Sequence, residues 1–344
     1  LYRVVPQLTP EDIYWIFVAA FSEMLAAGIT TVAEFFYLNG AGNSHAEAAI
    51  RAAQDTGIRL VLARTWMDAE SAPPQFRESI DQAASRTAEL MARYPQIEIC
   101  VAPHSLHAAS PEMIVAAMAF ADQHDCLVHI HVAEAEYEGA QTLAAHGATP
   151  IVLLDRLGVL NTRIVAIHAI FLTEDEKKLL AASGARVVHN PMTNQYLGDG
   201  TCDLSGLHAL GVPIGLGTDA DVKPSLIEEM RAASLLQKLA HRDGSKLGAA
   251  AAYRFGTAEG AAVLGIPAGD FRVGAHADFS VLDVSAIDPW TPLLNGLVYR
   301  AESGWIRETY VGGVQVYSTR RSTLAANAAI ALGSLARALG LQSI

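Results

Sequence analysis

The sequence has few cysteines and few charged residues. Only three of its 344 residues are cysteines (Cys100, Cys126 and Cys202), and no Cys-x-x-Cys spacing occurs. An odd number of unpatterned cysteines excludes a disulfide framework and favours a reducing compartment, so we expect a cytoplasmic protein. Charged residues make up 17% of the chain and hydrophobic residues 51%. This balance excludes intrinsic disorder, which needs low hydrophobicity and high charge.

Long hydrophobic runs and several catalytic motifs are also missing. The longest charge-free apolar stretch, residues 322–336, is shorter than the roughly 20 residues of a membrane span. The sequence contains neither a Gly-rich phosphate loop nor a Gly-x-Ser-x-Gly elbow, which argues against a phosphate cradle and against a serine hydrolase. The formal net charge is −12. Nucleic acid and anionic membranes repel such a protein, so we expect a small-molecule substrate instead.

What the sequence does contain is a repeated order of helix, glycine and short apolar run. The glycines are Gly28, Gly57, Gly184 and Gly211. Glycine is favoured just past a helix end, and continuous apolar runs are typical of parallel strands buried on both faces. Further candidate strands are residues 98–102, 126–132 and 163–167. The pattern therefore predicts seven strands, near residues 30, 60, 100, 128, 165, 187 and 215.

This alternation predicts an α/β protein with a (β/α)8 TIM-like barrel. A barrel of this kind has eight strands, and the chain begins with Leu1 rather than Met, so we expect strand 1 to precede it. After residue 266 we expect short strands at 278–283, 297–300 and 306–317, then a docking helix at 324–341. The predicted domains are the barrel (1–265), part of a small β-sandwich domain (266–320) and the C-terminal helix (321–344).

Polar residues gather at the predicted carboxyl ends of the strands, where parallel barrels hold their functional groups. His129 and His131 alternate along one strand, so their side chains point the same way. A neutral imidazole is a good zinc ligand, and Glu134 lies close enough to hold a metal-bound water. The other polar residues at strand ends are Glu34, Tyr37, Thr65, His104, His168, His189, Asn190, Asn194 and Asp219.

Each of these residues also has a structural interpretation. Two alternating histidines are more often structural than metal-binding, and a lone His168 on an apolar strand is more often a satisfied core residue. Asp219 could cap the following helix, although Asp221 or Ser225 could do so instead. The combination at three strand ends favours a hydrolytic metal site, because such a site needs ligands, a proton shuttle and an electrostatic partner for the bound water.

Two acidic positions are expected to be structural. Asp199 lies between two glycines, which is typical of a turn. Glu229, in the run Glu228-Glu229-Met230-Arg231, is predicted to lie on an exposed helix face.

These motifs resemble the amidohydrolase superfamily, in the deaminase-like branch that includes formimidoylglutamate deiminase, guanine deaminase and the triazine hydrolases. The matching segments are residues 131–134, 168–173, 190–200 and 217–219. Within the branch, residues 1–3, 33–38, 102–106 and 197–200 are most similar to formimidoylglutamate deiminase.

The resemblance implies one divalent metal ion, zinc, with iron or manganese as alternatives. It implies that His131 and Asp219 are metal ligands, that Glu134 is the general acid and base, and that His168 polarises the nucleophile or the substrate. Asp219 thereby also belongs to the catalytic group. The residues expected to contact substrate are Tyr37, His104, His107, His189 and Asn194. His189 could equally bond a backbone carbonyl, and Asn194 could cap its loop instead. The family further places a His-x-His pair at the end of strand 1, and no such pair precedes the strand near residue 30.

The expected reaction is hydrolysis at an amidine or aminated ring carbon with release of ammonia. A formimidoylglutamate-like substrate is one alternative, and a guanine- or aminotriazine-type deaminase or chlorohydrolase is another. His107 stands where the formimidoylglutamate enzyme has an Arg that meets a carboxylate, and residues 189–194 look more like the heterocycle deaminases. A non-catalytic binding scaffold is the alternative of a different class, and a homodimer is a compatible assembly.

Overall fold

The computed structural model describes residues 4–220, 223–319 and 322–341. The segment Leu1-Tyr2-Arg3 and the alternative cap Asp221 lie outside these ranges. No helix among the described residues is both long and apolar enough to cross a membrane.

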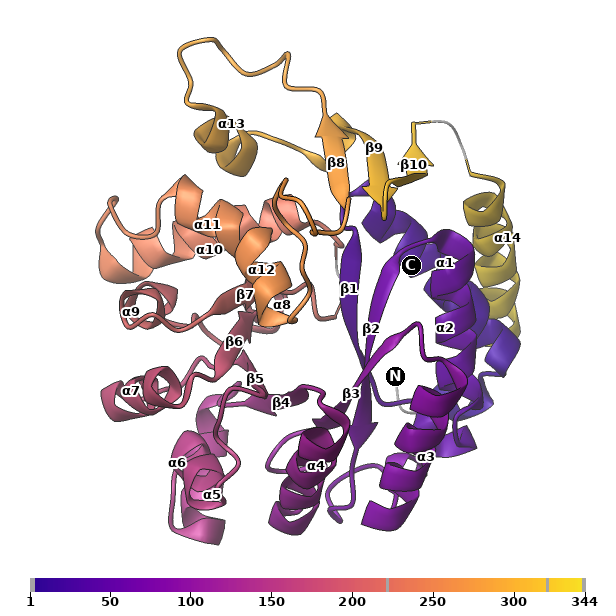
Figure 1. Ribbon diagram of the computed structural model, residues 1–344, viewed down its shortest axis with the longest axis vertical. Coiled ribbons are helices and arrows are strands. Elements are labelled where there is room, and N and C mark those ends of the chain that lie inside the picture. Colours follow the sequence, from indigo (N-terminus) through magenta and orange to yellow (C-terminus); the bar gives the residue numbers. More distant parts are fainter. Residues whose placement is uncertain (1–3, 221–222, 320–321, 342–344) are drawn as a thin grey trace.

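Seven parallel strands form one curled sheet in chain order (Figure 1). They are β1 (Thr31–Phe36), β2 (Arg59–Trp66), β3 (Glu98–Pro103), β4 (Val128–Val132), β5 (Ile164–His168), β6 (Arg186–His189) and β7 (Ile214–Leu216). The predicted parallel α/β architecture is confirmed. Among the described residues the sheet is an open half-barrel, because β1 and β7 are its two edges and do not pair with each other.

Helices cover the outer side of this arc (Figure 1). They are α1 (Pro10–Ala26), α2 (Ser44–Thr56), α3 (Ile80–Arg93), α4 (Pro111–His124), α5 (Glu136–His146), α6 (Pro150–Arg156), α7 (Glu174–Ser183), α8 (Pro191–Leu197), α9 (Leu204–Ala209), α10 (Leu226–His241), α11 (Ala249–Phe255) and α12 (Ala258–Val263). Single 3-10 turns are η1 (Val5–Gln7), η2 (Asn39–Ala41), η3 (Pro74–Phe76) and η4 (Ser303–Trp305). On β4, Val128, Ile130 and Val132 belong to the core cluster that includes residues of α4. Since side chains alternate along a strand, His129 and His131 face the concave side.

A smaller antiparallel sheet of three strands, in the order β10-β9-β8, lies next to the start of β1 and β2. Its strands are β8 (Phe279–Leu282), β9 (Ile306–Val311) and β10 (Val314–Ser318). The Thr309 hydroxyl donates to the carbonyl of Leu25 (2.7 Å), and Arg59 pairs with Asp278 (2.8 Å). These contacts attach the second sheet at the end of the barrel strands away from their carboxyl termini.

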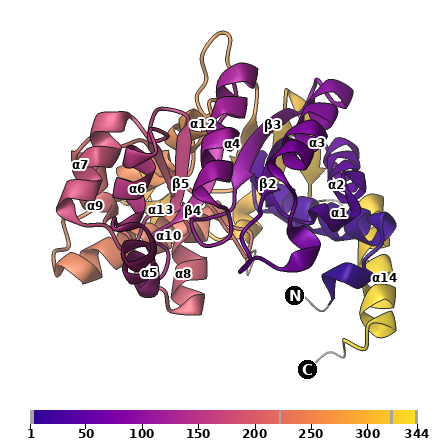
Figure 2. The same cartoon turned by 90° about the horizontal axis from the view of Figure 1, so that it is seen from below.

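The predicted strand at 297–300 is wrong, because these residues overlap α13 (Leu293–Tyr299). A short apolar run has too little periodicity to distinguish a strand from a buried helical turn. Here Pro292 precedes the helix, and Val298 is buried on its inner face. The predicted C-terminal helix is present as α14 (Thr323–Ala338), and Figure 2 shows it together with α1 and α2, on the opposite side of the molecule from α7 and α9.

Two helix-ending glycines also make room for the second sheet. Gly28 follows α1 with φ of 84°, and Gly57 ends α2 with φ of 81°. A Cβ atom on Gly28 would lie 2.9 Å from Ile306 Cδ1, and one on Gly57 would lie 2.6 Å from Val316 Cγ1. Both positions therefore need glycine for the left-handed backbone and for the close approach of β9 and β10.

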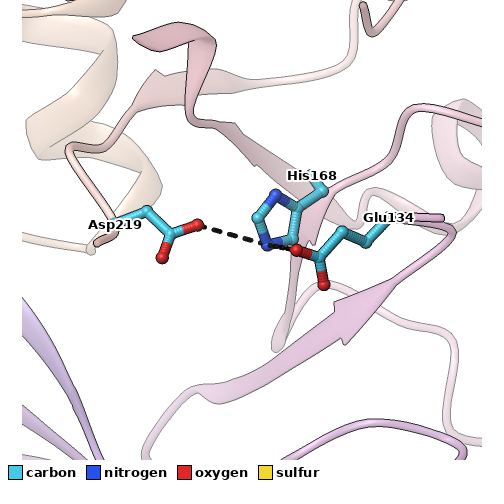
Figure 3. A group of neighbouring side chains, drawn as sticks. All are labelled: Glu134, His168 and Asp219. Atoms are coloured by element: carbon cyan, nitrogen blue, oxygen red, sulfur yellow. Dashed lines mark ion pairs between the residues drawn. The ribbon is translucent and has the colours of Figure 1, made fainter. Parts of the chain in front are cut away.

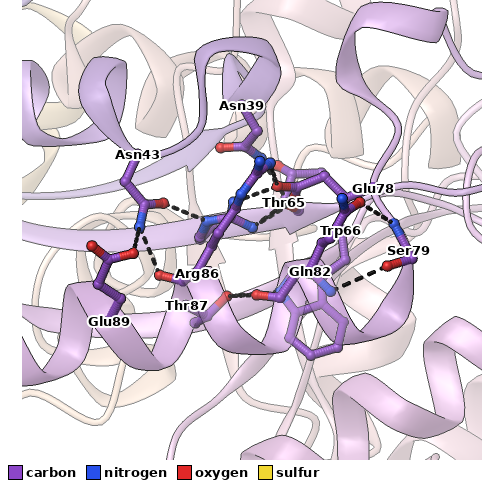
Figure 4. Close-up of polar contacts among 12 residues, drawn as sticks. Asn39, Asn43, Thr65, Trp66, Glu78, Ser79, Gln82, Arg86, Thr87 and Glu89 are labelled. Atoms are coloured by element: carbon purple, nitrogen blue, oxygen red, sulfur yellow. Dashed lines mark hydrogen bonds and ion pairs between the residues drawn. The ribbon is translucent and has the colours of Figure 1, made fainter.

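A buried ion pair fixes the connection between β2 and α3. The Arg64 side chain, fully buried, makes two parallel contacts to the Glu78 carboxylate, of 2.8 and 2.9 Å. Figure 4 shows the network around Glu78, which includes Arg86 and Asn43. The same connection carries Phe76, whose ring lies 5.7 Å from that of Tyr37 at the mouth of the half-barrel.

We expect Glu78→Gln to lower the free energy of unfolding by about 3 kcal/mol, because it leaves the buried Arg64 cation without a counter-charge. The matched control is Glu11→Gln. Glu11 pairs with Arg51 on the surface, where both side chains are at least half exposed, so the loss should stay below about 1 kcal/mol. Urea denaturation measures both, and equal losses would contradict the assignment.

Glu229 is not on an exposed helix face, so that prediction is wrong. Its side chain on α10 is fully buried, and its carboxyl accepts the backbone N–H of Met192 at the start of α8 (2.9 Å). Burial raises the pKa of Glu229 to about 8; the Met192 N–H opposes the rise, and Asp219 and Glu228 add to it. Folding therefore favours the protonated form of this carboxyl.

A pH dependence of stability follows from Glu229. Because its folded pKa lies above the ordinary value, the folded state binds more protons than the unfolded state between about pH 4.5 and 8. The contribution of Glu229 to the free energy of unfolding should fall with rising pH across this window. Glu229→Gln should remove this contribution, so its slope should be more positive than that of the wild type. Urea titrations at pH 5, 6.5 and 8 measure it, with Glu228→Gln as the control that keeps the slope. A wild-type slope retained in Glu229→Gln would refute the pKa shift.

Candidate active site

Three predicted site residues from three strand ends meet in one place (Figure 3). His168 is the last residue of β5, Glu134 follows β4, and Asp219 follows β7. The His168 Nε2 atom lies 3.5 Å from Glu134 Oε1 and 3.5 Å from Asp219 Oδ2. One ligand atom from each residue lies within 4.8 Å of the other two. The carboxyl ends of β4, β5 and β7 thus bring together Glu134 and Asp219, which are 85 positions apart in the sequence.

The backbone is strained at these strand ends. Among the described non-glycine residues, seven have positive φ, and four of them are Ala133 (53°), His168 (74°), Ala169 (50°) and Asp219 (49°). Such conformations cost on the order of 1–3 kcal/mol each and persist where the surrounding structure fixes them. Here backbone hydrogen bonds join the two turns, from Ala169 N–H to the Val132 carbonyl (3.1 Å) among others. The strain turns the side chains toward the common site, which favours a functional role.

His131 lies beside this group in a form suited to metal binding. Its ring stacks on that of His168, with centroids 5.3 Å apart, and its Nδ1 lies 3.0 Å from the backbone carbonyl of His104. A carbonyl only accepts hydrogen bonds, so Nδ1 carries the proton and Nε2 keeps its lone pair. Burial, with His104 and His168 adding to it, holds the pKa of His131 well below its usual range. A neutral imidazole with its other nitrogen fixed by a carbonyl is the usual state of a metal ligand.

The two carboxyl groups lack a compensating cation. Burial raises the pKa of Glu134 to about 7, and Asp219, Glu138 and Asp199 raise it further. Burial also raises the pKa of Asp219, against the lowering effects of His168 and of the Asn190 amide. Within the described residues, no lysine or arginine contributes to either shift. Carboxylates beside neutral imidazoles form a donor set that fits a divalent cation such as zinc.

Aromatic rings line the neighbouring strand ends. Phe35 of β1 lies 4.1 Å from the His131 ring between centroids, and the rings of Tyr37 and His107 lie 6.2 and 5.9 Å from that of His104. Burial lowers the pKa of His104 to about 4, and His107 and His168 contribute. Tyr37 and His107 therefore lie next to His104, whose ring is 4.9 Å from that of His131, and burial keeps His104 neutral.

The other two lie behind His168. His189 is fully buried, and its Nδ1 lies 3.2 Å from the His168 carbonyl. Asn194, also buried, contacts His168 Nδ1 and donates to Asp199 Oδ2. Substrate contact by His189 and Asn194 stays a prediction.

Two polar residues received no catalytic role from the sequence and belong to the same environment. Asn190 donates its side-chain N–H to Asp219 Oδ2 (3.1 Å), and Asp199, predicted as a turn former, accepts from Asn194 (3.0 Å). The sequence indicated their involvement only through their position in the polar stretch after β6. That stretch does not show that Asn190 contacts Asp219 or that Asn194 contacts Asp199.

Comparisons with known proteins agree with this geometry. The amidohydrolase family model matches residues 1–316. A 5-methylthioadenosine/S-adenosylhomocysteine deaminase from Thermococcus sibiricus is 30% identical over 321 residues, covering 91% of this chain and 73% of that protein. The crystal structure of an adenosine deaminase from Xanthomonas campestris with bound zinc has a TM-score of 0.86 at 29% identity, covering 96% of this chain and 76% of that one. An atrazine chlorohydrolase from Arthrobacter aurescens, complexed with zinc and atraton, shares the fold with a TM-score of 0.88 at 22% identity over 95% of this chain and 78% of that one.

The seven-stranded half-barrel and the meeting of polar groups at its strand ends therefore have a common explanation. The chain belongs to the amidohydrolase family, has deaminases among its relatives, and is a hydrolase that acts on C–N bonds.

Proposed function

We propose that the protein is a metal-dependent deaminase that removes an exocyclic amino group from an aromatic heterocycle, with an adenine-type nucleoside as the first candidate substrate. The observation that carries the proposal is the group of Glu134, His168 and Asp219 beside the neutral His131. The deaminases among the relatives, which are named for adenosine-type compounds, support this choice of substrate.

The residues that would hold the metal are His131 and Asp219. Both are neighbours of His168, through ring stacking and through a 3.5 Å contact. Zinc is the proposed ion, with iron or manganese as alternatives. A bound divalent ion lowers the pKa of water from 15.7 to about 7 and so makes a nucleophile available at neutral pH. A zinc site normally has at least three protein ligands. The resemblance assigns the others to a His-x-His pair at the end of strand 1, and no such pair precedes β1 in the described residues.

Glu134 is suited to move a proton in both directions. With a pKa raised to about 7, it is partly ionised at neutral pH, so it can take a proton from the attacking water and give one to the leaving nitrogen. The Glu134 carboxyl and His168 Nε2 are 3.5 Å apart. In this proposal the imidazole, which lies beside the proton carrier, stabilises negative charge that develops on the attacked substrate.

The choice between substrates follows from charge. Formimidoylglutamate carries carboxylates and would need a cationic partner. The aromatic group formed by Phe35, Tyr37 and His104 offers flat apolar faces, and burial keeps His104 neutral. Flat rings of this kind stack on a planar heterocycle. We therefore place the heterocycle deaminase ahead of the formimidoylglutamate-like alternative.

Glu134→Gln should reduce turnover by about 10²–10⁴-fold, because the amide cannot accept and return a proton. Metal content should stay at the wild-type level, since Glu134 is the proton carrier in this proposal. The matched control is Glu136→Gln, an exposed residue in the first turn of α5, which should keep wild-type turnover. Ammonia release and elemental analysis of the full-length gene product give both quantities. Unchanged turnover in Glu134→Gln would refute the role.

We expect ammonia release from adenosine or 5-methylthioadenosine to exceed that from formimidoylglutamate by at least 100-fold in kcat/KM. A chelator should abolish the activity, and added zinc should restore it. Aminotriazines and guanine complete the panel, and a preference for either would move the substrate within the heterocycle class. A preference for formimidoylglutamate would contradict the argument from charge, and activity unaffected by the chelator would contradict the metal.

A further inference from the structure

The outer face of α10 carries apolar side chains that the described part of the chain leaves uncovered. Leu235 and Leu239, one helical turn apart, are 49% and 74% exposed. On the neighbouring helix α8, Tyr196 is 73% exposed. Single exposed apolar side chains are normal on a soluble protein, whereas a group of them on one face marks an interaction site. The face therefore calls for a partner.

Leu235 lies between two hollows and lines both. A hollow of about 490 Å³ lies between α10, the turn at residues 244–249 and α13, and its lining includes Leu235, Lys238 and Tyr299. A second hollow, of about 350 Å³, lies between α10 and α8, and its lining includes Leu235, Leu239 and Met192. The same face thus presents projecting leucines and recesses beside them.

Buried hydrogen bonds hold the helices of this face in a fixed arrangement. The Ser234 hydroxyl of α10 donates to the carbonyl of Leu247 (2.6 Å) and lies 2.8 Å from the Tyr299 hydroxyl of α13. On the other side, the Glu229 carboxyl of α10 accepts the N–H of Met192 of α8 (2.9 Å). The two hollows are therefore formed before a partner arrives, and association needs little additional ordering.

The charges of this face suit a second copy of an acidic protein. The formal net charge of the chain is −12, so two copies repel each other over most of their surface. The charged residues that line the two hollows are Arg231, Lys238 and one carboxylate, Glu228. Both cations donate to backbone carbonyls of their own chain, and Glu228 pairs with Lys223. Two copies can therefore meet here without burying an unpaired charge.

The face is also large enough for a stable dimer. The helix α10 has 16 residues and is therefore about 24 Å long. Since α8 and α13 extend the face on two sides, it is three helices wide, or roughly 25 Å at the usual 8–10 Å between helix axes. Its outline of roughly 600 Å² lies at the lower end of stable interfaces, which bury roughly 600–1,000 Å² per partner.

We propose that the outer face of α10, with α8 and α13 at its sides, is the interface of a two-fold symmetric homodimer. Both copies use the same patch in such a dimer, so a face with projecting leucines and adjoining hollows can be its own partner. Leu235 and Leu239 of each copy enter the hollows of the other, as the ridges of one helix pack into the grooves of another. The assembly does not depend on the proposed reaction.

The dimer would also stabilise a helix that contacts the candidate active site. Thr193 of α8 donates its hydroxyl to the carbonyl of Thr218 (2.9 Å), the residue before Asp219. A second copy seated on the groove between α8 and α10 covers the opposite side of α8 from this contact. Assembly therefore holds the first turn of α8 against the end of β7.

Sedimentation velocity of the full-length gene product tests the assembly. We expect the mass of two chains for the wild type, and Leu235→Glu should raise the dissociation constant by about 100-fold, because symmetry places the new carboxylate in the interface twice. The matched control is Leu143→Glu on α5, since Leu143 is 52% exposed and lies far from α10 along the chain; it should keep the wild-type mass. Circular dichroism checks that each variant is folded.

Leu239→Glu is the second variant if Leu235→Glu does not fold, because Leu239 is more exposed and packs less against its own chain. A wild type that stays monomeric at about 100 µM, where even weak dimers with micromolar dissociation constants form, would overturn the proposal. A wild-type monomer that binds a different protein through this face would overturn it as well. Dimers that persist in both folded variants, or that also dissociate in Leu143→Glu, would contradict the assignment to α10.

Discussion

The site depends on two partly exposed carboxyl groups that lie against one buried imidazole, in a place where no described lysine or arginine compensates them. Taking a carboxylate out of water is expensive, and Glu134 shows this in a pKa raised to about 7. A protein with no use for the arrangement could relieve it with one basic side chain. This chain instead surrounds the carboxyls with neutral imidazoles and amides. The uncompensated charge is what a divalent ion would stabilise, and it also keeps Glu134 poised to exchange protons.

Several features far from the reacting centre keep this arrangement in place. The buried Arg64–Glu78 pair fixes the connection that carries Phe76 against Tyr37. Glu229 joins α10 to the start of α8, and the first turn of α8 contacts the ends of β5 and β7. The strained turns at Ala133, His168 and Asp219 can persist because these neighbours leave the backbone no alternative. The helices and connections around the sheet therefore hold the strained residues at the strand ends in place.

The sequence was most informative where local chemistry determines the structure. Glycines such as Gly57 and Gly184 end their helices in left-handed conformations, and the apolar runs that follow are strands as predicted. The sequence also indicated that His131, Glu134, His168 and Asp219 lie near one another. They are at or just after the carboxyl ends of their strands, and parallel strands place these ends at the same edge of the sheet. The strand predicted at residues 297–300 was wrong, because a run of three apolar residues before Arg300 is too short to show a period. The prediction that Glu229 is exposed was also wrong. An acidic residue in a charged run is usually exposed, but here the packing of α8 on α10 buries it.

The contacts of Asn190, Asn194 and Asp199 show why the remainder of the site could not be obtained from the sequence. Their positions along the chain, at a strand end, in a short helix and between two glycines, do not define their partners, which lie in the folded structure. His168 and Asn194, for example, are 26 residues apart in the sequence but in contact in the structure. Asp199 accepts a hydrogen bond from the Asn194 amide (3.0 Å), and Asn190 donates to Asp219 (3.1 Å). The packing of α8 against the ends of β5 and β7 makes these contacts, and no pattern along the chain records that packing.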